Sequence, residues 1–486
     1  MSIHPSVAPS SPDIGGGVGP PDAAPARPLI EQHGIDHIPE SERHGSIRDL
    51  AFTWSGCILN VTTLTYGSLL VAFGLNLWQA IAAILIGNIT WLIAGYLSLP
   101  GPATGMTAFM GSRAAFGRTG NRFPAVFNWI MQVGYETVNL SLMVLAATVL
   151  LDKMGIHTST TTKISLLVGL SLLQSLLPIF GYHAITKALR MLVIPFVILF
   201  AVMAVLTVGG LDDAAPIEPG SWQLFLAGVA LSASTAGLGW TGNAADYSRY
   251  LPTAIPKKRL VVGVALGGGI PQIALMILGA AVATLIPSAS DPITGLPEAF
   301  ASWFLVPYLI AVLLQMLAVN AFDLYSSGVT LQAIGIRVER WHAIAIDAVI
   351  SALLASAIVF SDSFNTLVTA FLLFMIVWFA PWAAIYSVDF FLRRGRYDLD
   401  SLSGSSGGLY VRPHGIHRPA VIAQLAGMVA AALCIDTSIF TGPIALALGH
   451  ADLSVPAGLL VGGIIYYVLA RHTIALESSQ QTRISA

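Results

Sequence analysis

The chain has 486 residues, of which 55% are hydrophobic and only 10% are charged, and its mean hydropathy is +0.76. Soluble domains carry about 25% charged residues, so this composition excludes an ordinary soluble protein and indicates a chain that lies mostly in lipid. The formal net charge of −2 and the lack of a basic arm give no sign of nucleic-acid binding. Cys57 and Cys434 lie in separate apolar stretches, so we expect neither a disulfide framework nor a metal site, and we expect no cofactor.

The first 47 residues are rich in proline, glycine and polar residues. They lack the basic region and the apolar region of a cleavable signal peptide. We predict that residues 1–47 form a disordered cytoplasmic tail, which tightens over residues 34–39 before the first apolar stretch.

Apolar stretches of about 20 residues are candidate membrane-spanning helices. The sequence contains twelve of them, at residues 50–73, 77–98, 122–151, 163–181, 185–208, 223–247, 259–286, 303–334, 342–360, 364–391, 418–438 and 453–471. An even number of spans places both termini on the same side of the membrane.

Lysine and arginine predict the orientation, because they gather in cytoplasmic loops. With both termini in the cytoplasm, 21 of the 23 basic residues fall on the inner side, and only Lys153 and Lys163 fall outside. The sequence therefore predicts a multi-pass protein of the inner (cytoplasmic) membrane with cytoplasmic termini.

The spans are predicted to form two inverted repeats of five, followed by two further spans. The predicted divisions are a first repeat at 48–208, a second repeat at 223–391, a cytoplasmic loop at 392–417, spans 11 and 12 at 418–471, and a cytoplasmic tail at 472–486. Under this division, span 1 corresponds to span 6 and span 3 to span 8.

Spans 1 and 6 are both interrupted by small and polar residues. Gly56 and Cys57 lie in the middle of the first span, and Gly239 and Trp240 lie in the middle of the sixth. Interrupted helices at corresponding places in two halves indicate a transporter site, so we predict these four residues to contact substrate. A surface of small residues for tight helix packing is the alternative interpretation.

Spans 3 and 8 each carry a carboxyl group in mid-span. Glu136 and Asp323 are costly residues in lipid, where a charge costs about 3 kcal/mol on insertion scales. We predict that they face an interior cavity and that one of them carries a coupling proton. The alternative is a protonated carboxyl group that only joins neighbouring helices.

The third span also presents an aromatic ring and an amide on one face. Tyr135 and Asn139 are four residues apart, and Trp240 of the sixth span offers a second ring. Two rings and an amide suit a flat heterocycle, which would stack on the rings and form hydrogen bonds at its edge.

Several motifs in this order are similar to those of the nucleobase–cation symporter-1 family, in its bacterial purine–cytosine permease branch. The resemblance covers nearly everything from residue 34 to about residue 471. Its markers are Gly34-Ile35-Asp36, Pro39-Glu40-Ser41-Glu42-Arg43-His44-Gly45, Gly74-Leu75-Asn76-Leu77-Trp78-Gln79-Ala80, Phe180-Gly181-Tyr182-His183-Ala184-Ile185, Ala245-Asp246-Tyr247-Ser248-Arg249-Tyr250-Leu251-Pro252 and Ala380-Pro381-Trp382.

The resemblance implies an all-α polytopic membrane protein with a five-plus-five inverted repeat of the amino-acid–polyamine–cation superfamily type. Its first and sixth helices are broken, and substrate lies between aromatic side chains that match Tyr135 and Trp240. Asn139 matches the amide of the third span. Asp323 stands where relatives commonly have asparagine, and Tyr135 replaces the usual tryptophan.

The resemblance also bears on the coupling ion. Sodium-coupled members coordinate the ion with carbonyl groups of the first span and hydroxyl groups of the eighth. The matching eighth-span positions are Leu314, Leu317 and Ala318, which have no hydroxyl group. Since a hard cation needs oxygen ligands, we expect proton coupling, with Glu136 or Asp323 as the carrier.

We therefore predict a proton symporter that imports cytosine or a purine by alternating access, and not an enzyme. The alternatives are a symporter of another small heterocycle (uracil, allantoin, a hydantoin or a thiamine-like vitamin), with sodium coupling still open. A channel would need a lined pore, whereas the polar residues here concentrate at one depth. A membrane-embedded enzyme is disfavoured because no mid-span nucleophile has a histidine beside it.

Overall fold

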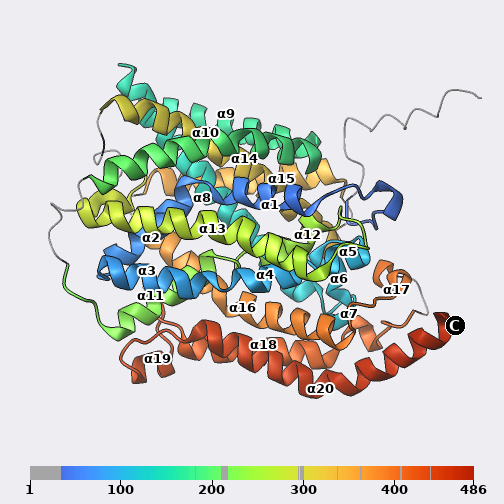
Figure 1. Cartoon of the computed structure of the whole chain (residues 1–486). Coiled ribbons are helices and arrows are strands. Elements are labelled where there is room, and N and C mark those ends of the chain that lie inside the picture. Colours follow the sequence, from blue (N-terminus) through green and yellow to red (C-terminus); the bar gives the residue numbers. More distant parts are fainter. Residues whose placement is uncertain are drawn as a thin grey trace, which may run out of the picture.

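The computed structural model describes residues 34–485, with gaps at 181, 210–216, 294, 296–299, 301, 337, 362–363, 405–407 and 438. Apart from one isolated bridge between Asp436 and Thr441, the regular structure of these described residues is helical (Figure 1). The helices at the predicted spans are α1 (Ile47–Ile58), α2 (Val61–Ala72), α3 (Leu77–Asn88), α4 (Trp91–Leu97), α8 (Arg122–Lys153), α9 (Thr160–Phe180), α10 (Tyr182–Val208), α11 (Trp222–Thr235), α12 (Ala244–Ser248), α13 (Lys257–Leu285), α14 (Ser302–Ile334), α15 (Arg340–Val359), α16 (Phe364–Leu392), α18 (Arg418–Cys434) and α20 (Ser454–Ser485).

The span prediction is confirmed by these helices. Ten helices in the described residues are long and apolar enough to cross a membrane, and the bent pair α1–α2 makes an eleventh candidate. The remaining predicted span, 223–247, coincides with α11, a short 3-10 turn at Thr241–Asn243, and α12. This span is not one long helix, because it is broken between α11 and α12, as the sequence predicts.

The first span bends by 57° between α1 and α2. Asn60 lies in extended conformation at the bend, and its side chain accepts a hydrogen bond from Thr63 N at 2.8 Å. An N-cap of this kind satisfies a backbone donor that the broken helix leaves without an intrahelical partner. The break is therefore stabilised by Asn60 itself, at a depth where water is not available to the backbone.

The sixth span breaks after Thr235. The carbonyl oxygen of Thr235 accepts a hydrogen bond from Gln272 of α13 at 2.9 Å, and Gln272 in turn accepts one from Trp91 of α4 at the same distance. A side chain at Gly237 would collide with the Trp91 backbone, so the chain can pass α4 only with glycine here. The end of α11 is thus held by α13, and the chain beyond it passes close to α4.

The packing places α8 beside α14 and α13 beside α1 and α2. Gly67 and Gly279 let α2 and α13 approach closely, because an added Cβ on either would meet the backbone of the other helix. In Figure 1, α18 and α20 lie along one edge next to α16, and α9 and α10 lie along the opposite edge. The broken spans and α8 lie between these edges, among neighbours that can bury their polar groups.

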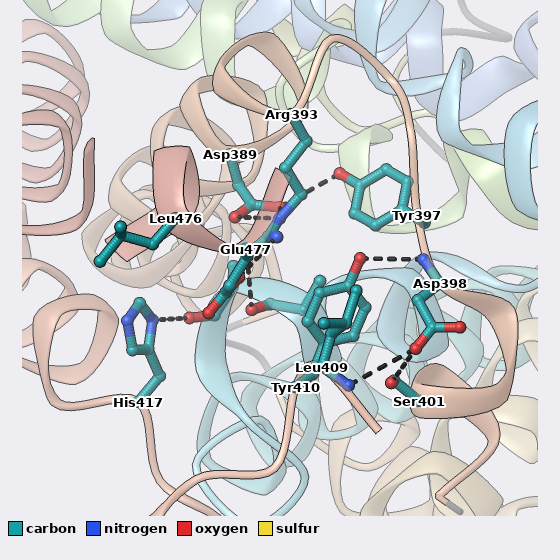
Figure 2. Close-up of polar contacts among 12 residues, drawn as sticks. Asp389, Arg393, Tyr397, Asp398, Ser401, Leu409, Tyr410, His417, Leu476 and Glu477 are labelled. Carbon is teal, nitrogen blue, oxygen red and sulfur yellow. Dashed lines mark hydrogen bonds and ion pairs between the residues drawn. The ribbon is translucent and has the colours of Figure 1, made fainter. Parts of the chain in front are cut away.

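The C-terminal helix is held to α16 by a buried group of charges (Figure 2). Arg393 lies 2.9 Å from Asp389 and 2.8 Å from Glu477 of α20, and Tyr466 donates a hydrogen bond to Asp389 at 2.7 Å. The segment 472–485, predicted as a tail, continues α20, and Glu477 is buried within this group. Arg412 from the preceding loop also pairs with Glu477.

The prediction of a disordered tail over residues 1–47 differs from the structure at 34–46; residues 1–33 lie outside the described part. Ile38 is buried, and its N–H donates to Gly105 O at 3.0 Å. The guanidinium of Arg43 donates to Ile38 O at 2.8 Å and to Pro102 O at 2.9 Å. The composition of this segment did not predict its order, because the bonds to Pro102 and Gly105 join it to a part of the chain about 60 residues away.

Candidate functional site: a cavity at the two helix breaks

A cavity lies where the two broken spans meet α8 and α14, with about 510 Å³ of empty space. The lining combines apolar, aromatic, hydroxyl and amide side chains with one carboxyl group. Its members are Ile58, Asn60, Thr62, Thr63, Tyr66, Met131, Gln132, Tyr135, Asn139, Thr235, Gly239, Trp240, Asn243, Val319 and Asp323.

Two aromatic residues predicted to bind substrate, Tyr135 of α8 and Trp240 of the broken sixth span, both line this cavity. The Tyr135 ring packs edge-on against Phe371 of α16 at 5.6 Å between centroids. The Trp240 ring packs edge-on against Trp54 of α1 at 5.7 Å. Each ring is therefore held in orientation by a second aromatic side chain behind it.

A polar edge joins α8 to α14 on one side of the cavity. Asn139 donates a hydrogen bond from Nδ2 to Asp323 Oδ2 at 3.1 Å and contacts Asn320 Oδ1 at 3.4 Å. Asn320 donates in turn to Gln174 of α9 at 2.5 Å. Because Asn139 uses its NH₂ group inside the protein, the groups left to face a ligand here are its carbonyl oxygen, which accepts, and Asp323 Oδ1, which accepts when Asp323 is ionised.

A second polar edge was not predicted from the sequence. Gln132 of α8 donates a hydrogen bond to Asn243 Oδ1 at 2.7 Å, and Asn243 donates to the Tyr247 hydroxyl at 3.0 Å. Gln132 is three residues before Tyr135 and seven before Asn139, so helical spacing alone puts all three on one face. That spacing was the available signal for Gln132, whereas nothing local indicated Asn243.

The remaining predicted residues are placed differently. Gly239 lines the cavity, but Gly56 and Cys57 do not. Gly56 packs against α10, since an added Cβ would lie 3.0 Å from Leu189 Cβ, and the Cys57 carbonyl accepts a hydrogen bond from Asn60 at 2.6 Å. Glu136 is fully buried behind the lining. The assigned roles of all these residues stay predictions.

A layer of aromatic rings from α1, α12 and α14 packs beside Trp240, near the end of the molecule where the N-terminal segment docks. Tyr247 lies 5.1 Å from Trp54 and 4.5 Å from Phe322, measured between ring centroids. Beyond Tyr247 is a second hollow of about 670 Å³ that Ser46, Arg190 and Tyr250 help to line.

The arrangement can bind a flat polar molecule, and it offers no evident site for a resident metal. Within the described ranges, no group of three or more histidine, cysteine, aspartate or glutamate side chains could hold a metal ion. The cavity provides three aromatic rings (Tyr66, Tyr135 and Trp240), hydroxyl groups, and amide and carboxyl groups that can form hydrogen bonds.

Comparison with known proteins places this site in a family. The sequence model of a family described as "Permease for cytosine/purines, uracil, thiamine, allantoin" matches residues 37–458. YxlA of Bacillus subtilis, named as a candidate purine-cytosine permease, is 30% identical over 94% of this chain and 99% of its own length. The cytosine permease of Escherichia coli strain K12 is 28% identical over 60% of this chain and 66% of its own.

Solved structures show the same fold. A closed conformation of Mhp1, a nucleobase-cation-symport-1 family transporter with bromovinylhydantoin bound, matches with a TM-score of 0.72 at 18% identity. The match covers 92% of this chain and 97% of that one. The expected all-helical architecture with an inverted repeat is thereby confirmed.

Proposed function

We propose that this chain, which belongs to the family of permeases for cytosine, purines, uracil, thiamine and allantoin, imports a nucleobase by proton symport. The observation that carries the proposal is the cavity at the two helix breaks, with Tyr135 and Trp240 as rings and Asp323 as acceptor. Stacking on aromatic side chains is worth about 1–3 kcal/mol per base and suits any flat heterocycle.

The acceptor edge favours a base with adjacent N–H and NH₂ groups. Asp323 is 2% exposed, and one of its oxygens already accepts a hydrogen bond from Asn139. A carboxylate accepts but does not donate, so it prefers the amino edge of cytosine or of an aminopurine over a carbonyl edge. The names of the B. subtilis and E. coli relatives support the same substrate class.

Proton coupling is supported by the surroundings of the first break. Leu314 is 45% exposed and faces away from the interior, and neither Leu317 nor Ala318 offers an oxygen. The carbonyl groups at the end of α1 already accept N–H donors: Ser55 O from Leu59, and Ile58 O from Asn60. Glu136 and Asp323 are then the proposed proton carriers.

The side chain of Gln315 adds to this argument. Its Oε1 accepts a hydrogen bond from Val61 N at 3.2 Å, at the start of α2. A neutral amide that is held at the break by a backbone donor occupies space that a cation would need. This residue is therefore a further reason to prefer the proton over sodium.

The inverted repeats are proposed to run from 48 to 208 and from 223 to 391, with the loop 392–417 and both termini in the cytoplasm. The distribution of the 23 basic residues supports this orientation in a cytoplasmic membrane. The hollow beside Arg190 then lies on the cytoplasmic side, so the aromatic layer at Tyr247 is the inner barrier of the site.

The test uses the purified full-length chain and a panel of cytosine, adenine, hypoxanthine, uracil, allantoin, benzylhydantoin and thiamine. The true substrate should raise the unfolding temperature, because a ligand at about 100 times its Kd stabilises by about 2.7 kcal/mol. That ligand should then accumulate in proteoliposomes under an inward proton gradient, with sodium replaced by choline. Stabilisation by thiamine or a hydantoin alone would overturn the nucleobase assignment, and a steep sodium dependence would overturn the proton.

A further inference from the structure

Two buried carboxyl groups lie outside the cavity lining, on neighbouring helices. Glu136 of α8 and Asp347 of α15 are both fully buried, and neither lines the cavity. Ser327 of α14 lies beside both of them. Three helices thus bring two acids and a hydroxyl group together inside the membrane.

Asp347 is well supplied with hydrogen-bond donors. Trp129 of α8 donates from Nε1 to Asp347 Oδ1 at 2.8 Å, and Ser327 donates from Oγ to Asp347 Oδ2 at 2.7 Å. Both oxygens therefore accept, which is the arrangement that suits a carboxylate anion.

Glu136 is in the opposite situation. In the part of the chain that the structure describes, neither of its oxygens has a hydrogen-bond partner, although both are buried. Its polar neighbours are Ser327, Asp347 and Asp323. The Ser327 hydroxyl group lies 2.7 Å from Asp347 Oδ2 and 3.2 Å from the Leu324 carbonyl oxygen. With its one proton directed at either acceptor, Ser327 can only accept from Glu136. Glu136 can pair with Ser327 only as a neutral acid that donates its own proton.

The residues around Glu136 and Asp347 favour a state in which the two acids hold one proton between them. The polar groups beside this pair are Trp129 on α8 and Asp323 and Ser327 on α14. Asn320 of α14, which bonds Gln174 of α9, also bonds the Glu136 carbonyl oxygen. Among the described residues, no lysine, arginine or histidine forms an ion pair with either acid. A second buried negative charge would therefore be uncompensated and costly.

The pair is also one helical turn from the substrate site. Asn320 donates a hydrogen bond to the Glu136 carbonyl oxygen at 3.3 Å, and the same asparagine contacts Asn139. Ser327 follows Asp323 by four residues on α14, so the two lie on one face of that helix. A shift of α14 when substrate binds would alter both contacts.

We propose that Glu136, Ser327 and Asp347 form a proton-sharing triad, in which Asp347 of the ninth span is a coupling residue that does not touch substrate. Glu136 gives its proton to Ser327 Oγ while Ser327 gives its hydroxyl proton to Asp347 Oδ2. Glu136 becomes the carboxylate and Asp347 the neutral acid, with no change in total charge. The triad adds a path for the coupling proton to the proposed function, and this proposal rests on that function for the direction of transport.

The test compares Ser327→Ala and Asp347→Asn with Ser327→Thr, which keeps the hydroxyl group. Ser351→Ala is the matched control, because Ser351 is a buried serine on α15 that bonds only a backbone carbonyl, Ala348 O. With one proton per substrate, a gradient of about one pH unit supports about tenfold accumulation of cytosine or adenine. We expect Ser327→Ala and Asp347→Asn to exchange substrate normally but to accumulate none, while Ser327→Thr and Ser351→Ala accumulate like the wild type.

A second measurement needs no substrate. The infrared carbonyl band of a protonated carboxyl group at neutral pH should disappear in Glu136→Gln, shift in Ser327→Ala, and stay unchanged in Ser351→Ala. If the wild type transports no base, the proposed function is wrong. The infrared band still tests the triad in that case, because its measurement needs no substrate. Wild-type accumulation in Ser327→Ala, or a band that Glu136→Gln and Ser327→Ala both leave unaltered, would overturn the triad. If Asp347→Asn does not fold, the Ser327 variants carry the test.

Discussion

The amide nitrogen of Asn139 lies 3.1 Å from a carboxylate oxygen of Asp323, and this contact joins the third span to the eighth beside the cavity. It holds one Asp323 oxygen inside the protein and leaves the other for a ligand. Asp323 can therefore be a fixed acceptor for substrate, a carrier of the coupling proton, or both.

Asp323→Asn separates these roles. Asparagine keeps the volume and one carbonyl acceptor but cannot change its protonation state. If Asp323 carries the proton, the variant should bind and exchange substrate in proteoliposomes yet fail to accumulate it against a gradient. If Asp323 only contacts substrate, accumulation should survive with altered affinity or base preference. Normal affinity, selectivity and accumulation together would show that Asp323 faces no ligand.

Tyr135→Ala and Trp240→Ala should each weaken substrate binding by about 1–3 kcal/mol, the scale of base stacking on an aromatic side chain. The measurement is a binding isotherm on purified protein, with Trp78→Ala as the control. Trp78 is 77% exposed on the outer surface, so its loss should leave affinity unchanged. Unchanged affinity in both cavity variants would remove the aromatic pair from the site.

Gln132→Leu should weaken substrate binding by about 1–1.5 kcal/mol, because it removes a polar group from the cavity and leaves Asn243 without its 2.7 Å donor. The matched control is Gln424→Leu. Gln424 is another buried glutamine, which lies in α18 and donates a hydrogen bond to the Trp378 carbonyl oxygen of α16. Both variants lose a buried amide, so only a loss specific to Gln132 supports its place in the site. Equal affinities in the two variants would contradict it.

Asp389→Asn should destabilise the fold by about 3–5 kcal/mol without changing substrate preference. It removes one partner of the buried Arg393 guanidinium, which lies between Asp389 and Glu477 (Figure 2). Thermal unfolding in detergent measures the effect. The comparison is Arg190→Gln, which breaks the exposed pair with Asp49 and should cost about 1 kcal/mol or less. An equal loss in both variants would refute a special role for the buried group.

Docking of the N-terminal segment should weaken as the pH falls. Burial, and after it the positive charge of Arg43, lowers the pKa of His37, whose Nε2 lies 3.0 Å from Arg43 Nη2. A histidine with a lowered pKa favours the docked state only while it is neutral, so the contribution begins to fall below about pH 6.5 and is lost as the pH drops through the lowered pKa of the docked state.

Hydrogen exchange of the amides at 34–46, measured at about pH 7.5 and about pH 5.5, checks this expectation after correction for intrinsic rates. His37→Gln keeps an acceptor that does not titrate in this range and should remove the difference. Protection that is equal at both pH values in the wild type would contradict the role of His37.

The sequence alone determined the features that depend on local regularities. Length and apolarity located the spans, and the small and polar residues located both breaks, because a lipid environment restricts which backbone can cross it. Helical spacing placed Tyr135 and Asn139 on one face. Helical spacing also puts Gln132 on that face, so the sequence could have predicted its place beside Tyr135 and Asn139.

Only the tertiary structure decided which helices meet. The bond from Gln132 to Asn243 joins residues 111 positions apart, and the one from Trp129 to Asp347 joins residues 218 apart. Gly56 packs against Leu189 of α10, a contact that the sequence did not indicate, and its role in substrate binding stays a prediction. The docked segment 34–46 and the packed end of α20 owe their order to carbonyl groups and charges on distant loops and helices. Such contacts follow from how whole helices pack, which no local pattern in the sequence specifies.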